Sequence, residues 1–191
     1  MRKRLVYKVT IACVILFYLG IGIANAFDDG FSAAKKIEGK YFTIYCSPQV
    51  DIFGLSQQLN VSPSDKIIVG GSANTMNLAD MLDTLYILVG DMLDMRIYSF
   101  KGNIKICPSQ QQLDSIYNNL FGRSLTSHAY SFYVYDMNTI YASAENFKIG
   151  VIGHEMAHAV ISHYFVVQPS VKIQEVLAGY VEYQLRKTDR K

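Results

Sequence analysis

The sequence predicts a single α+β domain in which a small mixed β-sheet packs against helices. Short runs with alternating apolar residues, the spacing typical of strands, occur early in the chain and again within 129–143. Apolar residues recur instead at helical spacing within 75–96. Two further stretches with helical character, 147–164 and the segment that begins at Pro169, end the chain, and no internal repeat is present.

The chain opens with the pattern of a secretory signal peptide. Basic residues precede an uncharged apolar run over 9–23, and small residues then lead to a predicted cleavage site after Ala26. The apolar run is shorter than the roughly 20 residues of a membrane span, which disfavours the alternative of an uncleaved anchor. We therefore predict a signal peptide over 1–26 and one exported domain over 27–191, periplasmic or secreted, without stable membrane insertion after cleavage.

The apparent basicity of the chain comes from this leading segment. The full sequence has 18 Lys and Arg against 16 Asp and Glu, but four of the basic residues and none of the acidic ones lie within 1–26. The remaining domain has 14 basic and 16 acidic residues, a net charge of −2. Within this domain no run of basic residues occurs before the last few positions, so we predict no nucleic-acid partner.

Three elements are predicted before residue 75. Residues 40–46 alternate as in a strand, and 50–59 favour a short helix. In 66–74 two consecutive glycines follow an apolar run, which is typical of a strand that ends in a turn.

The helix predicted over 75–96 has an apolar face and an acidic face. The apolar face carries Leu78, Met81, Leu82, Leu85, Val89 and Met92, and the opposite face carries Asp80, Asp83, Asp91 and Asp94. Hard cations are usually bound in loops that also supply carbonyl oxygens. We therefore interpret the four aspartates as a solvated outer face rather than as a calcium site.

A strand, a helix and a hairpin follow. Residues 102–109 read as a strand, and the next helix is predicted to begin at a Ser109 cap and to end near Gly122. The tyrosine-rich segment 129–143 predicts a hairpin with its turn at 136–138. No cations interleave its aromatic residues, so we expect them to cover the following helix rather than to stack on bases.

Two cysteines lie in the predicted domain. Cys46 and Cys107 each end an alternating run shortly before a proline. If the two strands are neighbours, the cysteines would lie within the roughly 7 Å Cα separation that a disulfide allows, and export permits its formation. We favour a disulfide, and the alternative is two buried thiols that pack as small hydrophobes.

The sequence HEMAH at 154–158 predicts a metal site. On a helix His154 and His158 differ by about 40° in direction and by one turn in height, so their side chains converge. Glu155 lies about 100° from His154, where its carboxylate reaches a metal-bound water but is poorly placed as a ligand. This is the arrangement in which two histidines bind Zn²⁺ and the glutamate acts as general base.

A catalytic zinc site also needs a third protein ligand and an open fourth position. His163 points about 180° away from His154 on the same helix and is predicted to pack or lie at the surface. The three-histidine motif H-E-x-x-H-x-x-G-x-x-H would need glycine at 161 and histidine at 164, where this chain has Ile161 and Tyr164.

Glu175 is the favoured third ligand. It lies on the helix that follows Pro169 and shares a face with Ala178, Gly179 and Glu182. The small residues Ala178 and Gly179 let two helix backbones approach closely, which would bring Glu175 within ligand distance of the histidine pair. Glu182, two turns further on, is predicted to support the site or lie at the surface rather than to bind the metal.

HEMAH at 154–158 followed by QEVLAGY at 174–180 resembles the gluzincin metallopeptidases, and particularly the peptidase MA-like group. The resemblance is strongest over 129–183 and weaker over 39–46. It implies a zincin-like fold, in which a small mixed sheet packs on the HExxH helix and a second helix carries the glutamate ligand.

Carried over residue by residue, the resemblance implies zinc ligation by His154, His158 and Glu175, with Glu155 as base and proton shuttle. It also implies an edge strand within 139–143 that pairs with an extended peptide substrate. One departure is Gly179, since many gluzincins have an aspartate at this position, four residues after the ligand glutamate. The residue that supports the first histidine is therefore unassigned.

Three hypotheses follow from these residues. The favoured one is an exported zinc peptidase that acts on peptides or proteins. The second is a zinc-binding but catalytically inactive module that binds peptides or assists envelope assembly, which the intact Glu155 disfavours. The third is a metal-free interaction domain in which the histidines only pack. The donor to the tetrahedral oxyanion stays open among Tyr180, Tyr183 and the tyrosines of the hairpin.

Overall fold

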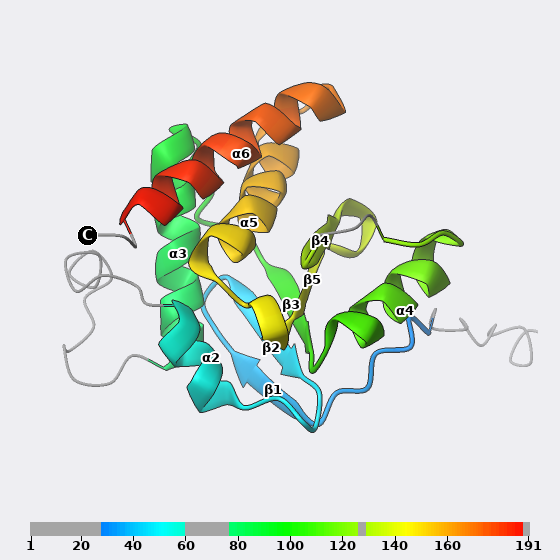
Figure 1. The fold of residues 1–191 in the computed structure, drawn as a ribbon. Coiled ribbons are helices and arrows are strands. Elements are labelled where there is room, and N and C mark those ends of the chain that lie inside the picture. Colours follow the sequence, from blue (N-terminus) through cyan, green and yellow to red (C-terminus); the bar gives the residue numbers. More distant parts are fainter. Residues whose placement is uncertain (1–27, 60–76, 126–128, 189–191) are drawn as a thin grey trace, which may run out of the picture.

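The protein is an α+β structure with a five-stranded mixed sheet and, within the described residues, five helices (Figure 1). The computed structural model describes residues 28–59, 77–125 and 129–188. The elements are β1 (Lys35–Glu38), β2 (Phe42–Cys46), α2 (Ile52–Leu59), α3 (Leu78–Leu93), β3 (Gly102–Cys107), α4 (Gln110–Phe121), β4 (Ser131–Val134), β5 (Thr139–Ser143), α5 (Ile149–Tyr164) and α6 (Val171–Thr188). The predicted signal peptide and the strand and turn predicted over 66–74 lie outside the described residues.

The sheet has the order β1-β2-β3-β5-β4. Its three central strands, β2, β3 and β5, run parallel, and β1 and β4 pair antiparallel with the strands beside them. The register aligns Ile44 with Ile104 and Ile104 with Ile140, and all three are fully buried. A row of β-branched side chains therefore crosses the centre of the sheet and forms the base of the main core.

Helices cover both faces of the sheet. The larger core lies between the face that carries Ile104 and the helices α2, α3, α5 and α6. The smaller core, which includes Tyr141, lies against α4 on the other face. Figure 1 shows α3, α5 and α6 grouped on one side of the sheet and α4 on the other. None of the helices in the described part of the chain is both long and apolar enough to cross a membrane.

The start of the described chain is fixed to the sheet by a buried carboxylate. Asp29 accepts hydrogen bonds from the hydroxyl of Tyr141 and from the ammonium of Lys105. Burial raises the pKa of Asp29, but these hydrogen bonds outweigh it and leave the pKa lowered. Asp29 therefore joins the start of the described chain to β3 and β5.

The disulfide favoured from the sequence is wrong, because the structure has free thiols at Cys46 and Cys107. The two strands are neighbours as expected, but their register pairs Cys46 with Ile106 rather than with Cys107. Successive residues of a strand point to opposite faces. Cys46 is consequently buried in the larger core and Cys107 in the smaller one, where each packs as a small hydrophobe.

The acidic face predicted on α3 is solvated at Asp80, Asp91 and Asp94 but not at Asp83. Asp83 is only 5% exposed. Its two carboxylate oxygens accept hydrogen bonds from the backbone N–H groups of Lys40, at 2.5 Å, and Tyr41, at 2.8 Å. Asp83 therefore fixes the β1–β2 turn against α3, and burial raises its pKa despite these hydrogen bonds.

Local signals placed the two ends of α4 and the hairpin turn correctly. The side chain of Ser109 caps α4 by accepting a hydrogen bond from the backbone N–H of Gln112, at 3.3 Å. Gly122 ends the helix with a φ of +64°, a conformation that favours glycine. The hairpin turn lies at 135–138, where Asn138 adopts a left-handed conformation between β4 and β5.

Candidate metal centre

The pair α5 and α6 carries the predicted ligands, and two glycines of α5 allow the helices to approach closely. A Cβ atom on Gly153 would lie 2.1 Å from Cδ1 of Leu185, and one on Gly150 would lie 3.0 Å from Cγ of Arg186. Ala178 on α6 is fully buried in the same contact. The prediction that Gly179 serves this approach is wrong, because a Cβ there would meet no atom within 4 Å.

The three predicted zinc ligands converge on one point. Nε2 of His154 and Nε2 of His158 lie 3.2 Å apart. The carboxylate of Glu175 places Oε2 3.5 Å from the first nitrogen and Oε1 3.5 Å from the second. Tetrahedral zinc with bonds of about 2.0–2.1 Å requires donor atoms roughly 3.3 Å apart. The separations and the donor set therefore fit a zinc ion, and among the described residues this is the one group of its kind.

The exposure of the ligands leaves one side of this group open. His154 and His158 are largely buried, whereas the side chain of Glu175 is 56% exposed. Burial lowers the pKa of His158, and the nearby His154 lowers it further, while Glu175 opposes both. A lowered pKa keeps the imidazole neutral, which is the form that binds metal.

Glu182 supports the first histidine. Its Oε2 lies 3.1 Å from Nδ1 of His154, so the Nδ1–H donates to the carboxylate and Nε2 is directed toward the other ligands. Its other oxygen lies 2.5 Å from the guanidinium of Arg186. A carboxylate that receives the second nitrogen of a metal-binding histidine fixes the orientation of the ring. Many gluzincins have an aspartate where this chain has Gly179. Here Glu182 instead supplies a carboxylate that orients the first histidine.

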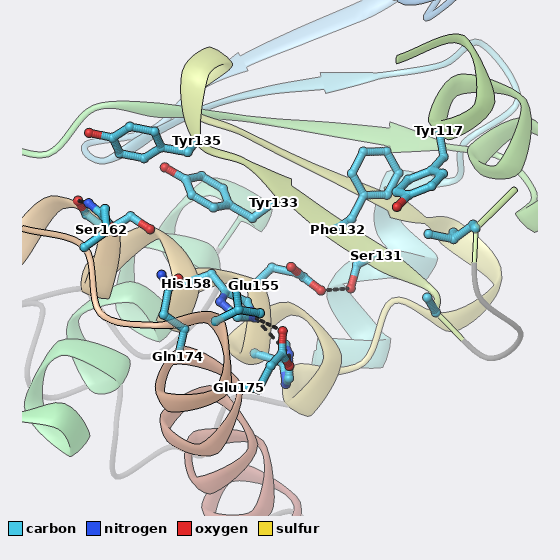
Figure 2. A pocket seen from close by; sticks show the side chains of 15 residues that line it. Tyr117, Ser131, Phe132, Tyr133, Tyr135, Glu155, His158, Ser162, Gln174 and Glu175 are labelled. Carbon is cyan, nitrogen blue, oxygen red and sulfur yellow. Dashed lines mark hydrogen bonds and ion pairs between the residues drawn. The ribbon is translucent and has the colours of Figure 1, made fainter. Parts of the chain in front are cut away.

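Glu155 is a buried carboxylate beside the histidine pair. It is only 7% exposed and accepts a hydrogen bond from the hydroxyl of Ser131, at 2.9 Å (Figure 2). Burial raises its pKa to about 7, while His154, the Ser131 hydrogen bond and the backbone of Tyr133 oppose the shift. A carboxylate with a pKa near neutrality can both accept and release a proton under physiological conditions.

Ser131 was not singled out in the sequence. It comes from β4 and lies two residues before Tyr133, so the alternation of the strand places both on the face toward α5. A polar residue at such an inward position usually has a buried partner. That signal was present in the hairpin, but the partner Glu155 lies 24 residues further along the chain.

Two hollows flank the metal centre. The larger, about 560 Å³, lies between the hairpin and the two helices, and Figure 2 shows Tyr133 and Tyr135 on one side of it and Tyr117 and Phe132 on another. The smaller, about 330 Å³, lies toward Glu182 and Arg186. Both are bordered by Ala129, Ser131, His154 and Glu155. An extended chain could therefore pass the metal centre with residues on either side.

The edge strand beside these hollows is β4 and not β5. The resemblance placed it within 139–143, but β5 lies between β3 and β4 and all its residues are buried. The prediction failed because the second strand of the hairpin, β5, pairs with β3, which leaves the first strand, β4, outermost. No described strand pairs with the free side of β4, and Ser131 of this strand contacts the general-base candidate.

His163 lies away from the metal centre, as predicted. Its Nε2 is 3.1 Å from the hydroxyl of Tyr133 and 3.2 Å from the side-chain oxygen of Asn138. Its ring packs edge-on against Phe100 at a centroid distance of 5.2 Å. Burial lowers its pKa. The residue therefore links α5 to the hairpin.

Comparison of the chain with profiles of known protein families, with curated protein sequences and with solved structures gave no match. The resemblance to gluzincins therefore stands on the HEMAH motif, on the segment 174–180 and on the geometry described above.

Proposed function

We propose that this protein is an exported zinc-dependent peptidase of the gluzincin type, with a zincin-like domain. In this proposal His154, His158 and Glu175 bind Zn²⁺ and Glu155 is the general base. The observation that carries the proposal is the separation of 3.2–3.5 Å among the three donor groups. The buried carboxylate of Glu155 beside them supplies the catalytic part of the proposal.

The protein's own residues move the proton. Zinc bound at the site would supply Lewis acidity, which lowers the pKa of water and polarises a carbonyl group. The carboxylate of Glu155 accepts a proton from the water that attacks the peptide carbonyl, and then donates it to the departing amine. The hydroxyl of Ser131 binds Oε1 of Glu155 and so orients the carboxylate while it changes charge.

The substrate in this proposal is an extended peptide or protein segment. It would lie along the free side of β4 by strand addition, in which backbone hydrogen bonds supply affinity. The larger hollow would receive an uncharged side chain, because no Lys or Arg of the described chain lines it and its carboxylates, Glu155 and Glu175, belong to the proposed machinery. No nucleic acid is proposed as a partner, since the exported domain carries a net negative charge.

The proposal is tested by measuring zinc and peptide cleavage on the same preparations. Wild type should bind one zinc per chain and cleave members of a broad peptide library. Glu155→Gln should keep its zinc and lose cleavage by about 10²–10⁴-fold, the usual contribution of a general base. If the wild type binds zinc but cleaves nothing, the alternative of an inactive zinc-binding module for peptides or envelope assembly replaces the enzyme.

Export is the second part of the proposal. It is supported by the basic and apolar leader with small residues before position 27. Expression of the full chain with fractionation of the cells should place the protein outside the cytoplasm, with Phe27 as its first residue by N-terminal sequencing. Recovery of the intact N-terminus in the membrane fraction would favour an uncleaved anchor instead.

A further inference from the structure

Helix α6 has a second apolar face that no described residue covers. Its buried face, with Ala178, Val181 and Leu185, packs on α5. On the opposite side Ile173, Val176, Tyr180 and Tyr183 follow one another at intervals of three and four residues, which forms one stripe along the helix. All four are exposed, Val176 and Tyr183 to 64%. We call this stripe the outer face of α6, and Figure 1 shows α6 lying across α5 and α3 at the margin of the fold.

The loop that leads into α6 carries further exposed apolar side chains. Val166 and Val167 lie between α5 and α6 and are exposed to 102% and 81%. Single exposed apolar residues are ordinary, but a contiguous set usually marks an interaction surface. The four side chains of the outer face of α6 are such a set, and Val166 and Val167 are further exposed valines in the loop that precedes the helix.

The lysines of α6 lie on or near its outer face, whereas its glutamates lie toward the metal centre. On an ideal helix Lys187 lies at the centre of the outer face and Lys172 lies about 60° from it. Glu175 and Glu182 lie about 120–140° from that centre, and both contact His154. Arg186 is paired with Glu182. The outer face of α6 therefore presents apolar side chains and cations, and no carboxylate from the helix itself.

We propose that the outer face of α6, together with Val166 and Val167, attaches the protein peripherally to an anionic phospholipid surface. Helices that lie in a membrane interface combine exposed apolar and aromatic side chains with lysines. Anionic headgroups attract such lysines over short range. The attachment is independent of the proposed peptidase activity, because none of these residues is a proposed metal ligand. Tyr180 and Tyr183, which the sequence left open as donors to the oxyanion, line neither of the two hollows beside the metal centre.

A second copy of the chain fits this face less well. A two-fold symmetric contact brings the same patch of both copies together. Lys172 and Lys187 would then face a surface that carries only cations, and like charges would be buried without partners. An anionic surface instead supplies the opposite charge to both lysines and accepts the valines and tyrosines into its interfacial layer.

The test is co-sedimentation with lipid vesicles. The protein from residue 27 onward is used, because this is the exported form in the proposal above and the apolar leader would bind lipid by itself. Vesicles of phosphatidylcholine mixed with phosphatidylglycerol are compared with pure phosphatidylcholine. Three double variants are compared with wild type: Lys172→Glu/Lys187→Glu, Tyr180→Ser/Tyr183→Ser, and the matched control Lys35→Glu/Lys36→Glu on β1. Thermal unfolding verifies that each variant is folded.

Wild type should bind the anionic vesicles and bind pure phosphatidylcholine much more weakly. Lys172→Glu/Lys187→Glu should weaken anionic binding by about 30-fold or more. Tyr180→Ser/Tyr183→Ser should weaken binding to both vesicle types, and the control should bind as wild type does. The proposal is overturned if wild type does not sediment with anionic vesicles, or if the control loses as much binding as the α6 charge variant. It is also overturned if the tyrosine variant only dissociates a dimer seen by sedimentation equilibrium.

Discussion

Asp83 and Glu155 are both buried carboxylates with raised pKa values, yet they occupy opposite kinds of environment. Both oxygens of Asp83 accept hydrogen bonds from the backbone of the β1–β2 turn. Glu155 accepts hydrogen bonds from the hydroxyl of Ser131 and from the backbone of Tyr133, and it borders a hollow beside two histidines. A buried carboxylate whose oxygens are occupied by backbone N–H groups stabilises a fold, whereas one that borders an open cavity is available for proton transfer. Burial alone does not distinguish them.

The largest effect should come from Glu155→Gln. The amide keeps the size of the side chain but cannot accept a proton, so kcat/KM for peptide cleavage should fall by about 10³-fold. The unfolding temperature should not fall, because a buried ionisable group has been removed. Cleavage assays and thermal unfolding on one preparation check both. An active Glu155→Gln enzyme would place the base elsewhere and remove the contrast with Asp83.

Asp83→Ala should have the reverse profile. It leaves the backbone N–H groups of Lys40 and Tyr41 without partners, which costs about 2–3 kcal/mol of unfolding free energy. Urea denaturation measures this loss, and zinc content and kcat/KM per folded chain should stay unchanged. The matched control is Asp80→Ala on the exposed side of the same helix, which should change stability by no more than about 0.5 kcal/mol. Loss of zinc in Asp83→Ala would contradict this prediction, because it would show that the metal centre depends on the β1–β2 turn.

The raised pKa of Asp83 also predicts how the stability of the protein changes with pH. The folded state binds a proton at this carboxyl more tightly than the unfolded chain does. The contribution of Asp83 to stability therefore falls as the pH rises above about 4, its ordinary pKa. In a comparison of wild type with Asp83→Ala, the difference in unfolding free energy should shrink as the pH rises through this range. A difference that grows with pH would mean that the pKa is lowered.

A pair of glycine variants tests whether the metal centre depends on close contact of α5 and α6. Gly153→Ala should destabilise the protein by about 1–3 kcal/mol and weaken zinc binding, because the new methyl group collides with Leu185. Gly179→Ala has open space around it and should be neutral or stabilise α6 by up to about 1 kcal/mol. Denaturation and zinc titration separate the two. Equal effects of the two substitutions on stability and zinc binding would contradict the close contact of α5 and α6 at Gly153.

Ser131→Ala should have the smallest effect. It removes one hydrogen bond to a charged group, so kcat/KM should fall by about tenfold. That hydrogen bond lowers the pKa of Glu155, so its loss should shift the acidic limb of the pH–rate profile toward higher pH. Ser162→Ala, at another hydroxyl that lines the same hollow, should leave the profile in place. An unshifted profile in Ser131→Ala would remove Ser131 from the proton-transfer site.

Features set by neighbouring residues were predicted well from the sequence. The Ser109 cap, the hairpin turn near Asn138 and the convergence of His154 and His158 all depend on residues within one or two turns of chain. Glu175 was also placed correctly beside the histidines, because helix periodicity fixed which face it occupies. Local spacing therefore gave most of the candidate site before any tertiary contact was known.

Features set by distant parts of the chain were predicted poorly. The thiols of Cys46 and Cys107 are separated by strand register, which follows from pairing and not from either strand alone. The burial of Asp83 depends on a turn 42–43 residues away, and the outer position of β4 depends on the order of strands. Periodicity also could not tell which small residues of α5 and α6 face each other. The close approach therefore lies at Gly153, to which no such role was assigned, and not at Gly179.

The most direct test of the account is the zinc-edge anomalous signal from crystals of the protein from residue 27 onward, grown with one equivalent of zinc. We predict one zinc ion per chain, bonded to Nε2 of His154, Nε2 of His158 and a carboxylate oxygen of Glu175, with Glu182 on Nδ1 of His154. An ion bound elsewhere, or a Glu175 carboxyl far from both imidazoles with no other ligand in its place, would contradict the account.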